Sequence, residues 1–178
     1  MENISTTIDS LIIRINKVVT DDRGFLAEIS HSFADDPFLK LGVKNIYVSV
    51  ARKKFVQRAG HFHNRNIENF FTVSGTSLWV FIDCRKESPT FNNIYTVILG
   101  SKKPSIETDI PFYTIDDSKM AQVLVPNGIY HVFWPLTDEE VTVLALASET
   151  YDKEDYERPD INNYQQIKAH LKKFGMTI

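Results

Sequence analysis

Cysteine and glycine are scarce in this sequence, and long apolar runs are missing. Only Cys84 and seven glycines occur among 178 residues. A lone cysteine excludes an internal disulfide and is typical of a reducing compartment, so we expect a cytoplasmic protein. No apolar run approaches the length of a membrane span, and residues 1–15 lack the basic start and cleavage site of a signal peptide. We therefore expect no membrane partner.

Excess positive charge is also lacking. The formal net charge is −3, and the Lys and Arg residues form no basic block. Non-specific nucleic-acid binding depends on many Lys and Arg side chains that neutralise phosphates, so we expect no nucleic-acid partner. A few clustered cations can still hold a small phosphorylated ligand.

Short runs of β-branched and aromatic residues, separated by turn residues, dominate what is present. Many short strands at this spacing predict an all-β barrel or sandwich. The length fits one domain over residues 1–178, with a substantial core. The expected strands cover residues 10–15, 25–30, 45–51, 69–73, 77–84, 94–99, 111–115, 121–126, 130–134 and 141–148.

The tail has a different pattern. Its apolar residues recur at helical spacing, which predicts a C-terminal helix over residues 161–174 that packs on the barrel or on a partner subunit. Asp160 is the expected N-cap, and Gly175 follows the helix end. The periodic positions are Ile161, Tyr164, Ile167 and Leu171.

Histidines gather in the stretch "HFHNRNIENFFTVSG", which begins at His61. Side chains alternate along a strand, so His61 and His63 would face the same side. Glu68 then falls on or near the next strand, and a distant stretch, "VPNGIYHVFW", supplies His131. These residues fit a metal site, a catalytic base with its supports, or histidines that are only hydrogen-bonded inside a barrel.

The spacing resembles the two motifs of the cupin superfamily, His-X-His-X4-Glu-X6-Gly and Pro-X-Gly-X2-His. The resemblance implies a jelly-roll β-barrel. In metal-binding cupins the three histidines and the glutamate hold one ion, and this donor set suits iron, manganese, nickel or zinc. The same pattern occurs in cupins that bind no metal. The matching positions are His61, His63, Glu68 and His131.

Further stretches resemble two families of sugar-nucleotide cupins. "DDRGFLAEIS", "FVQRAGHFHN", "RKESPTFNN" and "VPNGIYHVF" are similar to segments of the dTDP-4-dehydrorhamnose 3,5-epimerase family. Tyr47, His63 and "LALASETYDKEDYERPD" look more like the dTDP-4-keto-6-deoxyglucose 3,4-ketoisomerases. Both families act on nucleotide-linked 4-keto-6-deoxyhexoses without a metal. The resemblance thus implies an isomerase with no cofactor, and a homodimer in which an N-terminal segment contributes to the neighbouring barrel.

The expected chemistry is proton abstraction next to the C4 ketone, with His61 as the base. We favour epimerisation at C3. In the epimerases a tyrosine serves as the acid where this chain has Ala145, so we expect attack at one carbon and a phenol from another direction. Ketoisomerisation is the alternative, in which the proton moves from C3 to C4. The candidate catalytic residues are His61, His63, Tyr47 and Tyr151.

The substrate's diphosphate requires cations, and guanidinium groups match its oxygens. A metal-dependent cupin and a non-catalytic sugar-nucleotide-binding cupin remain as other classes of function. The usual destination of this chemistry is bacterial surface polysaccharide, such as lipopolysaccharide O-antigen, or a decorated secondary metabolite. The expected substrate-binding residues are Arg23, Glu28, Arg52, Arg58, Glu68, Tyr130 and His131.

Overall fold

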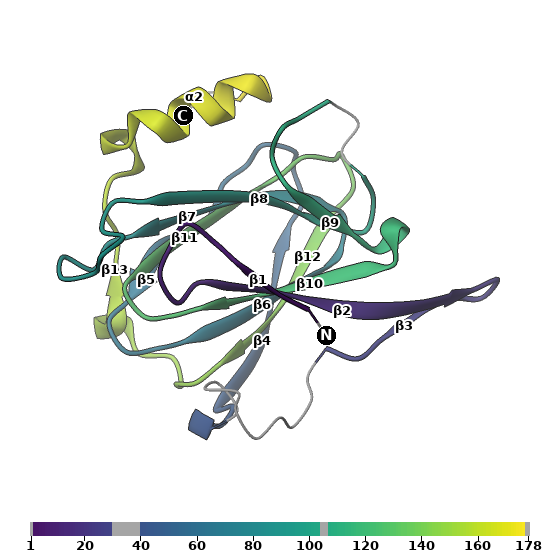
Figure 1. Ribbon diagram of the computed structural model, residues 1–178, viewed down its shortest axis with the longest axis horizontal. Helices are drawn as coiled ribbons and strands as arrows, with labels where there is room; N and C mark the ends of the chain where they lie inside the picture. The colour runs from purple at the N-terminus through teal and green to yellow at the C-terminus, as the bar shows by residue number, and fades with distance from the viewer. Residues whose placement is uncertain (1, 30–39, 104–106, 177–178) are drawn as a thin grey trace.

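The computed structural model describes residues 2–29, 40–103 and 107–176 and contains two β-sheets that face each other (Figure 1). The first sheet has the order β1 (Glu2–Ser5), β2 (Ile12–Asp21), β10 (Lys119–Val125), β6 (Glu68–Ser74), β12 (Val141–Ala147) and β4 (Asn45–Ala51), with β3 (Gly24–Ala27) paired to β2. The second has the order β13 (Tyr156–Glu157), β5 (Arg58–His63), β11 (Ile129–Pro135), β7 (Thr76–Asp83), β8 (Ile94–Gly100) and β9 (Phe112–Thr114).

The main core lies between the sheets. Alternate residues of each strand point inward, and aromatic rings stack there: the Trp79 ring lies 4.7 Å from that of Phe133 and 5.7 Å from that of Phe81. Every residue of β7 and β11 is buried, because the outer face of their sheet is covered as well. A strand that is buried on both faces has a continuous run of apolar residues in its sequence, whereas a strand with one exposed face alternates apolar and polar residues.

The C-terminal segment covers that outer face (Figure 1). The apolar residues expected to pack do so, but the expected single helix over 161–174 is wrong in its bounds. A 3₁₀ turn, Ile161–Asn163, precedes α2 (Gln165–Lys173). Asp160 accepts a hydrogen bond from the Asn162 amide and so caps the turn rather than α2, and Tyr164 breaks the helical backbone between them.

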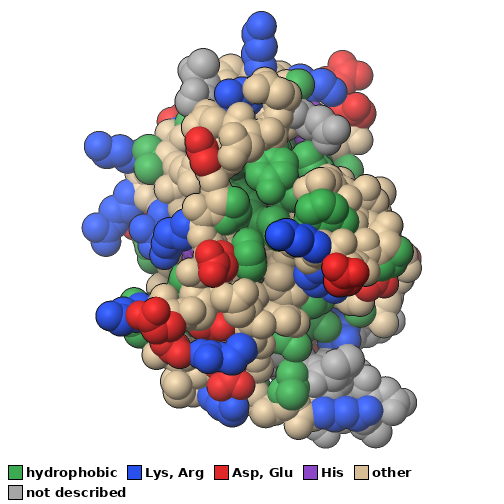
Figure 2. All heavy atoms as spheres, turned by 90° about the vertical axis from the view of Figure 1, so that its left-hand side faces the viewer, with side chains coloured by type: hydrophobic (Ala, Val, Ile, Leu, Met, Phe, Trp, Pro, Cys, Tyr) green, Lys and Arg blue, Asp and Glu red, His purple; other side chains and the backbone are tan. Residues whose placement is uncertain are grey.

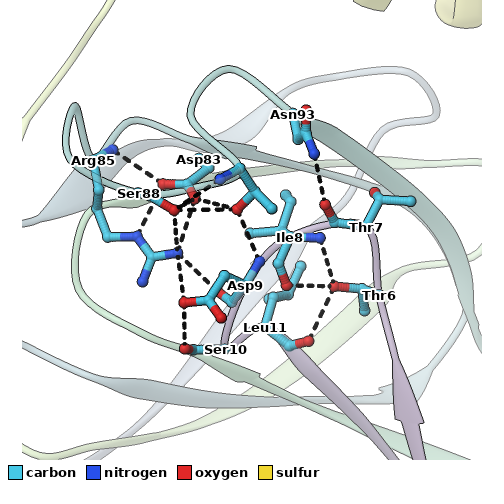
Figure 3. A network of polar contacts seen from close by, with 11 residues as sticks. Thr6, Thr7, Ile8, Asp9, Ser10, Leu11, Asp83, Arg85, Ser88 and Asn93 are labelled. Carbon is cyan, nitrogen blue, oxygen red and sulfur yellow. Dashed lines mark hydrogen bonds and ion pairs between the residues drawn. The ribbon is translucent and has the colours of Figure 1, made fainter.

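A polar network fixes the N-terminal segment to the loop after β7 (Figure 3). The buried Asp83 carboxylate accepts hydrogen bonds from Arg85, Ser88 and Thr90. Arg85 also donates to the Asp9 carbonyl at 2.7 Å. Burial raises the pKa of Asp83, but these hydrogen bonds outweigh it and hold the pKa below its usual range.

Each predicted strand overlaps an observed one, and the ends agree within three residues except that β2 continues six residues past the predicted end. The predicted ranges did not include β1, β5 or β13. The last residue of the predicted strand 25–30, Ser30, lies outside the described residues. Figure 2 shows side chains of both charge signs around a hydrophobic area, with no continuous basic track across this face. Among the described residues, none of the helices has the length and apolar character to cross a membrane.

Candidate active site

A cavity of about 370 Å³ opens between the two sheets. Its walls come from β4, β5, β6, β11 and β12, and the segment 147–156 after β12 forms one side of it. Most of the residues singled out from the sequence meet here. The predicted residues that line it are Tyr47, Arg58, His61, His63, Glu68, His131 and Tyr151.

Three imidazoles meet on one wall because β5 and β11 are neighbours. The register places His131 opposite His61, and alternation along β5 brings His63 to the same side. The His61 ring lies 4.6 Å from that of His131 and 4.9 Å from that of His63. Burial, with the two neighbouring imidazoles next in weight, lowers the pKa of His61 to about 2. His61 is therefore neutral, and its buried Nδ1 has no hydrogen-bond partner.

Glu68 joins this wall to the opposite sheet. Tyr47, from β4, donates a hydrogen bond of 2.6 Å to Glu68 Oε1. Burial raises the pKa of Tyr47, and the Glu68 carboxylate raises it further, so the phenol keeps its proton. For Glu68, burial raises the pKa, but the close approach of the His63 and His131 imidazoles and the Tyr47 hydrogen bond outweigh it and leave the pKa lowered.

The other carboxylate oxygen of Glu68, Oε2, faces one nitrogen of His63 and one of His131. Oε2 lies 3.2 Å from His63 Nε2 and 3.3 Å from His131 Nε2, yet none of these three buried atoms has a partner in hydrogen-bonding geometry. His131 Nδ1 lies 3.2 Å from the Ile129 carbonyl, which can only accept, so its proton sits on Nδ1. The lone pairs of Glu68 Oε2, His63 Nε2 and His131 Nε2 therefore point toward one another. A shared proton or a bound cation between these atoms would satisfy them.

Asp155 was missed by the sequence analysis. Its Oδ2 lies 3.1 Å from His63 Nδ1, and both residues are buried. The carboxylate also accepts hydrogen bonds from the backbone amides of Arg65 and Asn66, which fix its orientation. Asp155 thus orients the His63 ring and directs a proton to Nδ1.

Tyr156 was missed as well. It pairs with His63 across β13 and β5, and its ring lies 4.4 Å from that of His63 and 4.7 Å from that of His61. Arg158 covers the ring with its guanidinium carbon 5.4 Å from the centroid. Both missed residues belong to "YDKEDYERPD", a stretch whose family likeness was visible although these two positions were not singled out.

A metal ion is one group that the convergent atoms could hold. His61, His63, Glu68 and His131 each offer one ligand atom, and these atoms lie within 4.8 Å of one another. Each residue also has a buried side-chain atom without a hydrogen-bond partner, as an ion site would require. Three imidazoles and a carboxylate suit a divalent transition metal, which would supply Lewis-acid chemistry if bound.

Four predicted binding residues do not line the cavity. Tyr130 is buried on the opposite face of β11, because it precedes the inward-facing His131. Arg52 pairs with Glu140, and Glu28 lies exposed near the end of β3. Arg23 lies at the tip of the β2–β3 hairpin beside Asp21, 84% exposed and outside this cavity.

Ala145 is completely buried in β12, directly opposite Tyr47 in the register with β4. The position where the epimerases carry a tyrosine thus has no polar group here. The residue opposite it on the adjacent strand, Tyr47, supplies a phenol instead.

The model of one protein family, described as dTDP-4-dehydrorhamnose 3,5-epimerase, matches residues 5–111, more than half of the chain. The match includes His61, His63 and Glu68 and ends before His131 and Asp155. A search of curated protein sequences gave no match.

Solved structures with the same fold include several sugar epimerases. The RmlC epimerase of Mycobacterium tuberculosis is 23% identical with a TM-score of 0.73, over 91% of this chain and 74% of that one. A dTDP sugar isomerase from Desulfovibrio desulfuricans is 17% identical with a TM-score of 0.69, over 89% and 90%. ChmJ, a 3'-monoepimerase from Streptomyces bikiniensis, is 20% identical with a TM-score of 0.68, over 88% and 72%. These likenesses confirm the expected jelly-roll barrel.

Proposed function

Because the chain belongs to the dTDP-4-dehydrorhamnose 3,5-epimerase family, we propose that this isomerase inverts C3 of a nucleotide-linked 4-keto-6-deoxyhexose. The observation that carries the proposal is the state of His61 in the cavity. Its imidazole is neutral and has a buried nitrogen without a partner, so it can accept a proton from a bound substrate.

The C4 ketone acidifies the hydrogen on C3. His61 takes this proton, and the electron pair of the C–H bond moves through C4 onto the ketone oxygen to give an enolate. Tyr47 projects from the opposite sheet and can return a proton to the other face of C3, which inverts the carbon. The cycle closes when the Tyr47 phenolate takes up a proton and His61 releases the one it accepted, both by exchange with water after the product leaves, and the restored phenol again donates to Glu68 Oε1.

The diphosphate of the substrate would bind at the opening of the cavity, where Arg58 lies. Arg58 lines the cavity, is exposed, and donates a hydrogen bond of 3.2 Å to Ser49 Oγ, which holds its guanidinium toward the opening. ChmJ was crystallised with dTDP-quinovose, which supports a dTDP-linked substrate here. We propose a homodimer in which Arg23 of each chain reaches the other chain's nucleotide. We also propose that the protein is cytoplasmic and takes part in the synthesis of lipopolysaccharide O-antigen.

A second candidate function is 3,4-ketoisomerisation. The arrangement of His61 and His63 favours it, because two imidazoles lie side by side on one wall and Asp155 supports the second. One imidazole could remove the C3 proton while the other places a proton on C4 from the same face. The two candidates share the first step and differ in where the proton returns.

NMR in deuterated water separates these functions. The protein is incubated with dTDP- and CDP-4-keto-6-deoxyglucose, and the sugar protons are followed. Loss of the C3 proton with a retained C4 ketone and an inverted C3 supports the proposal. A ketone that moves to C3 identifies a ketoisomerase, and exchange at C5 as well identifies a 3,5-epimerase. No exchange with either sugar contradicts the proposal.

A further inference from the structure

The enolate formed in the proposed reaction needs a hydrogen-bond donor at its oxygen. The hydroxyl and imidazole groups of the cavity wall around Glu68 already have other partners or neighbours. Tyr47 donates its hydrogen bond to Glu68, and the Nε2 atoms of His63 and His131 face the same carboxylate. Glu68 cannot serve either, because an ionised carboxylate only accepts hydrogen bonds. The oxyanion partner must therefore come from another residue.

Tyr156 meets the geometric requirement. Its ring lies against both His61 and His63, so the side chain stands directly beside the proposed base. The enolate oxygen is on the carbon adjacent to C3, which means that base and donor must stand close together. Tyr156 lines the cavity and is half-buried, and its hydroxyl makes no hydrogen bond to the described residues that surround it.

The surroundings also favour a donor at this position. The Arg158 guanidinium over the ring and the pairing of β13 with β5 hold the side chain in place. A phenol is protonated at neutral pH, so Tyr156 has a proton to share with the substrate oxygen. Tyr151 has a ring 5.7 Å away but is 74% exposed, which leaves it less suited to the same role.

We infer that the Tyr156 hydroxyl donates a hydrogen bond to the C4 oxygen of the substrate and stabilises the enolate. The inference rests on the proposed function and extends it. The proton itself moves from C3 to His61, and Tyr156 keeps its own proton throughout. Loss of one such donor typically lowers kcat by about 10²–10³-fold.

The test is Tyr156→Phe, measured as the rate of C3 proton exchange in deuterated water. The ring contacts with the histidines remain, so we expect a folded variant with an unchanged melting temperature. The exchange rate should fall by about 10²–10³-fold with little change in KM, and the isotope effect with C3-deuterated substrate should increase. Tyr164→Phe is the matched control, because it removes a phenol oxygen beside Cys84 on the outer face of the same sheet.

The outcomes are distinct. Slow exchange in Tyr156→Phe with normal exchange in the control supports the inference. Normal exchange in both variants overturns it and leaves the proposed function standing. An inactive wild-type protein refutes the proposed function and this inference with it. Should Tyr156→Phe fail to fold, a fluorotyrosine at position 156 keeps the ring and hydroxyl, and a rate independent of phenol acidity would overturn the inference.

Discussion

The substitution Asp155→Asn replaces a buried carboxylate that contacts two backbone amides and the His63 ring. Oδ1 of Asp155 accepts from the Arg65 amide at 2.8 Å, while Oδ2 accepts from the Asn66 amide at 3.2 Å and faces His63 Nδ1 at 3.1 Å. An asparagine keeps one acceptor oxygen and replaces the other with an NH2 group. If the NH2 group takes the place of Oδ2, it faces the Asn66 amide and the His63 ring. The Asn66 amide is itself a donor, so it would lose its hydrogen bond.

The cost follows from these contacts. A buried N–H left without a partner costs about 1–3 kcal/mol, and the loss of charge assistance adds about 1 kcal/mol. We expect the free energy of unfolding to fall by about 3 kcal/mol. For a chain of this length such a change lowers Tm by about 6–12 °C. The amide would also donate to His63 Nδ1, so the proton of His63 must move to Nε2.

Urea unfolding and nitrogen-15 NMR of the histidine rings measure the two effects. Asp152→Asn is the matched control, because Asp152 is 42% exposed in its side chain and an asparagine can still cap the following 3₁₀ turn. We expect the control to remain within about 0.5 kcal/mol of wild type. An equally stable Asp155→Asn variant, or an unchanged His63 tautomer, would refute the assigned contact.

Three further predictions address the fold and the cavity. Gly128→Ala should destabilise the protein by about 1–3 kcal/mol in urea unfolding, since φ is +77° and the new Cβ would lie 2.4 Å from Arg85 Cγ; Gly42→Ala, with φ +78° and open space, isolates the backbone strain, and equal losses would contradict the clash. His61 has a folded-state pKa of about 2, so the unfolded chain takes up a proton that the folded chain cannot. Stability should fall by up to about 1.4 kcal/mol per pH unit below pH ~6, and His61→Asn should make this slope shallower by that amount. Metal analysis of protein purified without chelators should find substoichiometric metal, and one bound ion per chain would contradict a metal-independent enolate mechanism.

Much of the fold could be predicted because strand periodicity and turn residues are local signals. The bounds of the C-terminal helix could not, since Asp160 fits the N-cap pattern of either a 3₁₀ turn or an α-helix, and the spacing of the apolar residues does not distinguish the two. The two-residue strand β13 carries no periodic signal of its own. It exists because its backbone pairs with β5 across the cavity edge.

The residues of the site could be predicted where their spacing along a strand determines the face to which their side chains point. His61 and His63 share a face because they are two residues apart on one strand, and His131 joins them through the register. Asp155 and Tyr156 could not be placed in this way. Their positions depend on how the segment after β12 folds back over β5, a contact between residues about 90 apart in the chain.

The central claim is that His61 removes the C3 proton of a nucleotide-linked 4-keto-6-deoxyhexose. The most direct test follows that proton by NMR in deuterated water for wild type and for His61→Asn, which keeps a polar side chain in the cavity. The account predicts exchange and inversion at C3 in wild type, and no exchange above the uncatalysed rate in a variant that melts like wild type. Exchange at the wild-type rate in His61→Asn would contradict it.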